Sequence, residues 1–299
     1  MRSAGLRPRP AQRPQAGARR TLPPQDQGAR LRELNATPRD TTFDAHMPVA
    51  ASMGVTLGFA VLAIAVAILF VVGNLVASRR LGDDPRVANR IAARAFVGVA
   101  AWMVLTALAA ASGVLARFDS RPPPIAGLFL AVFAVSSAIG FTRAGDRLAR
   151  GLPLTALVGV QGFRLPLELV MHQAARDGLM PAQMSFSGWN FDIVTGATAI
   201  ALAVLIGAGR APRALIVAWN ALGIALLTGI LSLALASTPT IHAFGKDARA
   251  VNTFVAYVPF VWLPAVLVVA AIVGHIVITR KLLMDESSKV SHGPTMLNI

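Results

Sequence analysis

The sequence predicts an all-α integral membrane protein, a polytopic bundle of about seven transmembrane helices. Composition is the first reason, because 55% of the 299 residues are hydrophobic and only 14% are charged, too little charge to cover a soluble domain of this length. Patterning is the second, because the apolar residues form repeated blocks about as long as the ~20 residues that cross a bilayer. The chain has no cysteine, which excludes disulfides and thiolate chemistry.

Seven apolar segments account for most of the chain and define a transmembrane domain over residues 47–281, followed by a polar tail over 282–299. The segments are 53–78, 95–116, 125–142, 152–175, 188–209, 214–237 and 255–279. Small residues recur at four-residue spacing within them, as at Ala63 and Ala67, which favours close helix packing in lipid. No internal repeat is visible.

Residues 1–46 differ from the rest of the chain. They contain nine Arg, six Pro and four acidic residues with almost no apolar pattern, which predicts a disordered tail. Its position conflicts with the orientation derived below, since nine arginines would have to precede the first span on the outer side. We therefore expect that translation begins at Met47 or Met53, or else that the tail is a basic arm that binds acidic lipid headgroups.

The orientation follows from the basic residues of the short loops. If all seven segments span, one side carries thirteen Lys and Arg and the other five; if the fourth segment does not span, the split becomes eleven to seven. Since the richer side is cytoplasmic, the sharper split predicts seven crossings with the N-terminus outside and the C-terminus inside. The net charge of +14 then reports orientation, and nucleic-acid binding is not expected.

Charged residues inside the fourth segment are the main functional signal. Gln161, Arg164, Glu168 and His172 are three, four and four residues apart, so they share one helix face. Arg164 and Glu168 are spaced to pair directly. Each charge at a helix centre costs about 2.5–3.5 kcal/mol on the insertion scale, so a chain that keeps two must pair, hydrate or use them.

Asn190 and Asp192 begin the fifth segment close to where the fourth ends. We therefore predict an outward-facing polar pocket between the fourth and fifth helices, formed by Gln161, Arg164, Glu168, His172, Asn190 and Asp192. Structural roles remain open for each member. Arg164 with Glu168 can be a neutral pair that locks the bundle, Asp192 can cap a helix start, and His172 can be an amphipathic boundary residue.

Polar residues elsewhere give weaker signals. Asn74, Asn220 and His275 are expected to make interhelical or headgroup contacts near the cytoplasmic helix ends. Pro259 and Pro264 are expected to kink the last helix.

The stretch from residue 161 to 196, with FRLPLELVMH followed by MPAQMSFSGWNFDIVTG, resembles a segment of uncharacterised bacterial multi-pass, seven-helix membrane proteins. That resemblance implies a bacterial inner-membrane location and no known reaction, and Trp189 departs from the basic residue expected at its position. Named seven-helix families fit less well. The last segment lacks the lysine to which microbial rhodopsins attach retinal, and the histidines are too scattered for a ceramidase-type zinc site.

Three functional hypotheses follow. The first is a transporter or sensor of a small polar or anionic solute, with Arg164 binding the anion and Glu168 and His172 carrying a proton. The second is an intramembrane enzyme, which could be a metal-dependent hydrolase, that uses Glu168, His172 and Asp192; the third is a structural membrane subunit. No cofactor or metal is expected, the lipid bilayer is the expected partner, and the oligomeric state stays open.

Overall fold

The computed structural model describes residues 51–247 and 249–291, and all of its regular secondary structure in those ranges is helical. Contacts divide the chain into two units, Met1–Ala45 and His46–Ile299, and every described residue belongs to the second. The tail predicted over 1–46 and the last eight residues lie outside the described part. The predicted all-helical fold with several membrane-length helices is confirmed.

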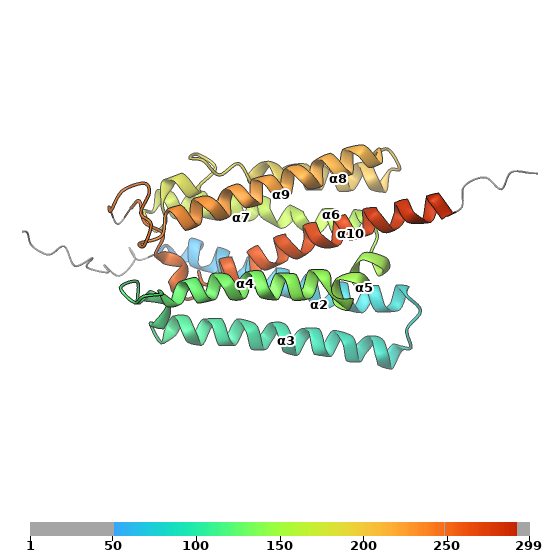
Figure 1. The fold of residues 1–299 in the computed structure, drawn as a ribbon, viewed down its shortest axis with the longest axis horizontal. Coiled ribbons are helices and arrows are strands. Elements are labelled where there is room, and N and C mark those ends of the chain that lie inside the picture. The colour runs from blue at the N-terminus through green and yellow to red at the C-terminus, as the bar shows by residue number, and fades with distance from the viewer. Residues whose placement is uncertain (1–50, 248, 292–299) are drawn as a thin grey trace, which may run out of the picture. The chain divides into compact units, whose positions relative to one another are not determined.

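Nine α-helices are described (Figure 1). They are α2 Met53–Arg80, α3 Pro85–Ala111, α4 Pro124–Phe141, α5 Arg143–Gly151, α6 Leu154–Val160, α7 Arg164–Arg176, α8 Ile193–Gly207, α9 Arg213–Ala236 and α10 Val269–Ser291. Short 3₁₀ turns lie at η1 Val114–Ala116, η2 Gln161–Phe163, η3 Ala182–Met184 and η4 Phe254–Ala256, and a π-helical segment, η5 Leu263–Val268, leads into α10.

Six helices of the described chain are long and apolar enough to cross a membrane. Four are α2, α3, α4 and α9; the fifth is the continuous run Leu154–Arg176 through α6, η2 and α7, and the sixth runs from η5 into α10 over Leu263–Glu286. The fifth predicted segment is different, because its helix α8 has only 15 residues. At about 1.5 Å per residue it is about 22 Å long, shorter than the ~30 Å hydrocarbon layer.

Local sequence explains where the helices begin. The side chain of Ser52 accepts a hydrogen bond from Val55 N at the start of α2, and Asp84 accepts one from Arg86 N at 2.8 Å at the start of α3, both as N-caps. Pro85 and Pro124 occupy first-turn positions, where a missing N–H has no cost. Between α2 and α3, Gly82 has a φ of 80°, a conformation that glycine adopts readily.

The segment between α7 and α8 runs back along α7 instead of remaining outside the bundle. Side chains pair in antiparallel order along it: His172 contacts Ser185, Glu168 contacts Asn190, and Arg164 contacts Asp192. Arg164 is near the middle of the 23-residue run Leu154–Arg176. The irregular segment 177–192 therefore enters the bundle to about half its depth before α8 begins.

From that level α8 continues towards the start of α6. Gly207, its last residue, lies near Thr155, with 3.6 Å between an added Cβ on the glycine and Thr155 Cγ2. Segment 177–192 and α8 together thus cover the length of Leu154–Arg176, the first half as irregular chain and the second as helix. Non-helical backbone at membrane depth is tolerated where protein buries it, and Ser185 and Asn190 are both buried.

Several predicted boundaries differ from the structure. The second membrane-length helix begins at Pro85 rather than near residue 95. The last membrane-length helix begins at Leu263 rather than near residue 255, because a 3₁₀ turn and Pro259 precede it, and Pro264 lies in a π-helical turn. At the other end α10 continues to Ser291, so the first ten residues of the predicted polar tail are helical.

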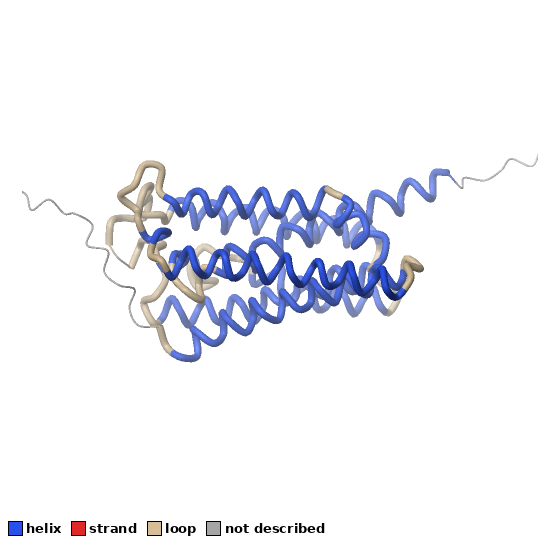
Figure 2. Tube along the Cα trace, turned by 90° about the horizontal axis from the view of Figure 1, so that it is seen from below, coloured by secondary structure: helices blue, strands red, loops and turns tan. Residues whose placement is uncertain are grey.

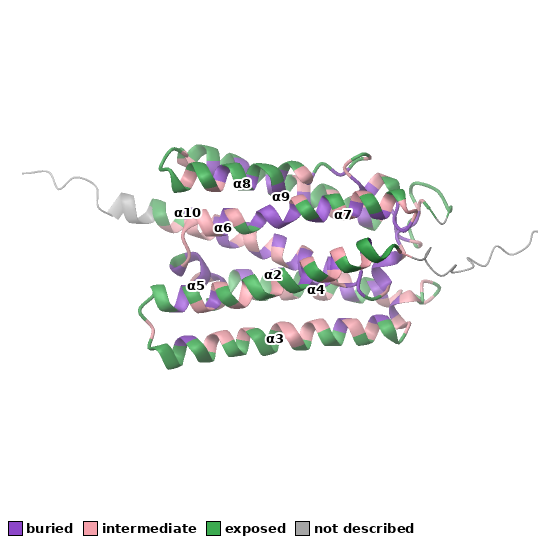
Figure 3. Cartoon of the chain, turned by 180° about the vertical axis from the view of Figure 1, so that it is seen from behind, coloured by how far each residue is buried: buried purple, intermediate pink, exposed green. Residues whose placement is uncertain are grey.

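Helix α10 is the central element of the bundle and packs against α4, α5, α6 and α9. Figure 2 shows the same helices from a perpendicular direction. Buried residues concentrate on the segment from Leu263 through α10, whereas α3 is mostly exposed (Figure 3). The exposed positions include large apolar side chains such as Phe96 and Leu130, as expected for a surface that faces lipid.

The crossing of α7 and α8 depends on Gly196. A Cβ at this position would lie 2.9 Å from the carbonyl carbon of Arg164 and would also strike the backbone nitrogen of Leu165. We expect Gly196→Ala to lower the free energy of unfolding by about 1–3 kcal/mol, because backbone must move apart. Unfolding of the purified protein in detergent measures this loss.

The matched control is Gly127→Ala in α4, where an added Cβ meets nothing within 4 Å. There we expect a change of less than about 1 kcal/mol, in the stabilising direction, because alanine favours helix more than glycine does. Equal effects of the two substitutions would contradict the close approach of α8 to α7.

Candidate functional site

A buried arginine lies at the centre of the candidate site. Arg164 begins α7 and is 1% exposed. Its Nη1 atom is 3.2 Å from Asp192 Oδ1, forming an ion pair, and 3.1 Å from Nε2 of His275. Its Nη2 atom is buried without a hydrogen-bond partner in the described chain. One guanidinium thus connects α7, the residue before α8, and α10.

Further hydrogen bonds lead from His275 towards the C-terminal end of α10. His275 Nδ1 is 2.8 Å from Asn220 Oδ1, and Asn220 Nδ2 donates to Thr279 Oγ1 at 2.8 Å. Because the amide oxygen only accepts and the guanidinium only donates, Nδ1 of His275 carries the hydrogen and Nε2 accepts from Arg164. The imidazole is therefore neutral in this arrangement.

Glu168 lies one turn further along α7 and has a different partner. Both of its carboxylate oxygens accept from Asn190 Nδ2 at 2.8 Å, and Asn190 also donates to the carbonyl of Met184. Asn190 Oδ1 accepts from the backbone nitrogen of Asp192 at 3.0 Å. Asn190 therefore positions both carboxylates.

The sequence spacing predicted that Arg164 and Glu168 can pair directly, whereas the structure pairs Arg164 with Asp192. No ion pair involves Glu168 within the described residues. The cluster thus holds one guanidinium, two carboxylates and a neutral imidazole, all from residues at most 5% exposed. It carries one excess negative charge when both carboxylates are ionised and none when one holds a proton.

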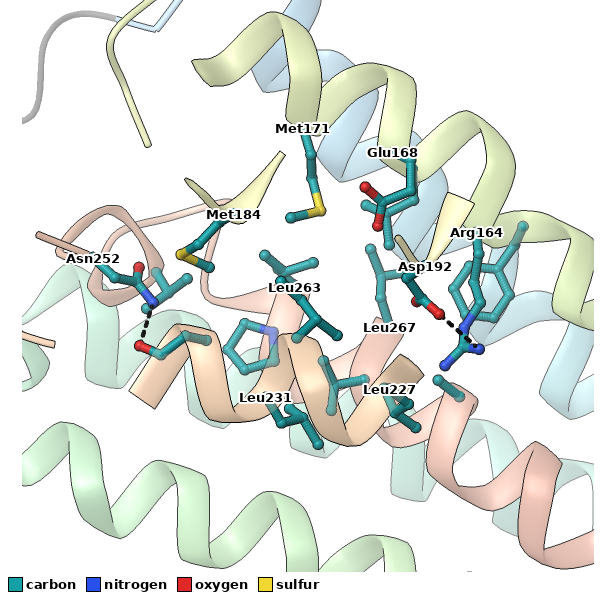
Figure 4. Close-up of a pocket in the computed structure, with 18 of the residues that line it drawn as sticks. Arg164, Glu168, Met171, Met184, Asp192, Leu227, Leu231, Asn252, Leu263 and Leu267 are labelled. Carbon is teal, nitrogen blue, oxygen red and sulfur yellow. Dashed lines mark hydrogen bonds and ion pairs between the residues drawn. The ribbon is translucent and has the colours of Figure 1, made fainter. Parts of the chain in front are cut away.

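A cavity of about 60 Å³ adjoins the cluster, enough for a few water molecules. Arg164, Glu168 and Asp192 line one end, and apolar side chains of α4, α7, α9 and η5 form most of the wall. At the other end are Met184 and Asn252, next to the loop after α9 (Figure 4). Three charged groups and the amide of Asn252 therefore face a cavity whose remaining wall is apolar.

The structure brings together part of the predicted pocket. Arg164, Glu168 and Asp192 line the cavity, and Asn190 supports them from outside it. The cavity lies among α7, α9 and η5, rather than between the fourth and fifth helices alone. Gln161 lines a different cavity, which borders the first half of the run Leu154–Arg176.

His172 lies away from the cavity. Its Nδ1 atom is 3.0 Å from Ser185 Oγ, and its ring stacks on Phe186 with centroids 4.4 Å apart. In residues 51–247 and 249–291, no three His, Asp or Glu side chains lie close enough together to hold a metal ion. The arrangement therefore gives no donor set for a metal-dependent enzyme that uses His172 with Glu168 and Asp192.

Sequence reasoning missed the role of two members of the cluster. The interhelical contacts expected of His275 and Asn220 are present, but their connection to Arg164 was not expected; the two residues are 2% and 5% exposed. Each is an isolated polar residue in an apolar segment. That isolation was their one signal, because buried polar groups in a membrane require partners.

Comparison with known proteins adds no relative: no protein-family model matches the chain, and no curated protein and no solved structure is significantly similar to it.

Proposed function

We propose that this chain is a proton-coupled transporter of a small polar or anionic solute, with the solute bound at the cluster of Arg164, Glu168 and Asp192. The observation that carries the proposal is the position of these three charged groups on a cavity inside an apolar helix bundle. Ionisable residues inside membrane bundles mark solute, ion and proton pathways.

Breaks in the regular α-helical structure near the cluster support a transport site. The 3₁₀ turn η2, the first residue of α8 and the π-helical η5 all border the cluster or its cavity. Transporters commonly form their binding sites from discontinuous helices near the middle of the membrane. The unpaired Nη2 atom of Arg164 supplies a hydrogen-bond donor for an anion.

The charge balance supports proton coupling. The excess carboxylate can take up one proton, and Glu168 is its natural site because it has an amide partner while Asp192 already pairs with Arg164. An arriving anion that interacts with Arg164 would weaken its hold on Asp192. Binding of the anion would then favour uptake of a proton.

A polar path leads from the cluster towards the opposite membrane side. It passes from Arg164 through His275 and Asn220 to Thr279, while the cavity extends the other way to Asn252. A purely structural ion pair requires neither this path nor the second carboxylate.

The proposal includes seven crossings, with the N-terminus outside and the C-terminus in the cytoplasm of a bacterial cell. Segment 177–192 and α8 together make the fifth crossing. Its support is the reach of α8 towards Thr155, together with the charge asymmetry of the loops.

Single-cysteine labelling tests this topology, because the chain contains no native cysteine. We expect Ser187→Cys to react with an impermeant maleimide added to whole cells, and Arg80→Cys and Arg210→Cys to react only after the membrane is opened. All three positions are exposed. If Ser187→Cys and Arg210→Cys react from the same side, α8 does not complete a crossing.

Glu168→Gln tests proton coupling. The amide keeps an oxygen that can accept from Asn190 but cannot bind or release a proton. We expect the purified variant to remain folded and to lose at least tenfold of the solute-driven proton movement into liposomes, read with an internal pH dye across a panel of small carboxylates and inorganic anions.

The matched control is Glu286→Gln, which removes an exposed carboxylate on α10 that pairs with Arg213. This variant should transport like the unchanged protein. Unaltered proton movement in Glu168→Gln would refute the coupling role, and absence of any gradient-driven flux in the unchanged protein across the panel would refute the transporter.

Substitutions in the ion pair of Arg164 with Asp192 distinguish a role in transport from a purely structural role. Arg164→Met and Asp192→Leu each leave one buried charge unpaired, so each should lower the free energy of unfolding by about 3–5 kcal/mol. The double variant should recover most of this stability yet transport nothing. A double variant that is both stable and fully active would show that the pair serves only to hold the bundle together.

A further inference from the structure

A second and larger cavity lies along the first half of the run Leu154–Arg176, where α6 and Gln161 line it, whereas the cluster lies in the second half. Its volume is about 620 Å³, within the ~300–1,000 Å³ range of ligand pockets. Its walls come from α2, α3, α4, α5, α6, η5 and α10. Apart from the indole of Trp102, only Arg94 and Gln161 contribute polar side chains to the described lining.

The packing of α3 accounts for this space. Helix α3 packs mainly on α2, with smaller contacts to η1 and η5, and its buried residues are Ala88, Thr106 and Ala110. Two indoles connect it with the segment around η5: Trp102 Nε1 donates to the carbonyl of Ala265 at 2.7 Å, and Trp262 Nε1 donates to that of Met103 at 3.1 Å. These hydrogen bonds hold α3 against the segment around η5 at the end of the cavity that Trp102 lines.

Small side chains on α3 leave the space beyond the indoles open. Gly98 lines the cavity, and a Cβ added there would meet nothing within 4 Å. The cavity therefore extends from Trp102 along α3 towards the end of the helix that begins at Pro85.

A row of arginines leads from that end of α3 to the cavity. Arg86, Arg90 and Arg94 follow one another at four-residue spacing, so they share a helix face, and all three are exposed. Within the described chain their side chains have no ion-pair or hydrogen-bond partner. Other arginines of the same end do have carboxylate partners, as Arg213 has Glu286 and Arg280 has Asp146.

Gln161 supplies a polar group within the cavity wall. The residue is 1% exposed, and its Oε1 atom has no hydrogen-bond partner in the described chain. Its amide nitrogen lies against Gly274 of α10, where any Cβ would strike it. A buried, unpaired acceptor beside an apolar cavity calls for a hydroxyl or a water molecule as its donor.

We propose that this cavity binds an anionic phospholipid, with one acyl chain between α3 and α10 and the headgroup phosphate on Arg90 and Arg94. The apolar wall suits a hydrocarbon chain, and unpaired arginines next to a membrane-facing cavity suit an anionic headgroup. A headgroup hydroxyl, or water held by it, would donate to Gln161. A free inorganic anion has no hydrocarbon part that could fill the apolar cavity.

Lipid binding to the purified full chain tests the proposal. Native mass spectrometry in detergent, with phosphatidylglycerol or phosphatidylcholine titrated in, should show preferential retention of the anionic lipid. At about 1 kcal/mol per arginine, Arg90→Gln with Arg94→Gln should weaken phosphatidylglycerol binding by roughly tenfold to thirtyfold. The matched control is Arg143→Gln with Arg210→Gln, which removes two exposed, unpaired charges outside the cavity and should change binding less than threefold.

Gly98→Leu tests the acyl chain independently of charge. The added side chain should occupy the cavity and weaken phosphatidylglycerol binding at least tenfold, whereas Gly127→Leu on α4, also free of neighbours within 4 Å, should not. The proposal would be overturned if phosphatidylglycerol and phosphatidylcholine were retained equally, or if the control pair of substitutions weakened binding as much as the Arg90 and Arg94 pair. It would also be overturned if inorganic phosphate alone bound as well as phosphatidylglycerol. None of these readouts depends on transport.

Discussion

The arrangement of the bundle depends on the need to pair the buried guanidinium of Arg164. A buried arginine requires a counter-charge and polar partners, and Arg164 forms an ion pair with Asp192 before α8 and a hydrogen bond with His275 on α10. His275 in turn requires Asn220 on α9. Helices α7, α9 and α10 and the residue before α8 therefore meet at the depth of Arg164. Helix α8 begins directly after Asp192, the residue that pairs with this arginine.

Much of the fold was predictable because the length and the mean hydropathy of an apolar segment depend only on the residues of that segment. Six of the seven predicted apolar segments correspond to membrane-length helices. The fifth, predicted over 188–209, begins as helix only at Ile193, since the preceding residues are paired with α7. Hydropathy does not register such side-chain pairing, so the entry of 177–192 into the bundle could not be read from the sequence.

The site was predictable to the extent that spacing determines it. The four-residue interval correctly placed Arg164 and Glu168 on neighbouring turns of one helix, but the choice of partner depends on segments distant in sequence. Asn190 reaches Glu168 across 22 positions, and His275 reaches Arg164 across 111. No local pattern contains that information. Gln161 shows the same limit, because it lies in the 3₁₀ turn η2 and lines a different cavity from Arg164 and Glu168.

The loop after α9 is joined to the segment that carries Asn190. Gln183 Nε2 donates to the carbonyl of Ala250 at 2.8 Å and to Ser237 Oγ at 3.2 Å, and Asn252 N donates to the carbonyl of Ser237 at 2.6 Å. Gln183 and Asn190 belong to the same short irregular stretch. An antibody fragment or small molecule that displaces this loop would therefore draw Asn190 away from the Glu168 carboxylate, so a ligand bound at this end of the bundle would act on the buried cluster without entering it.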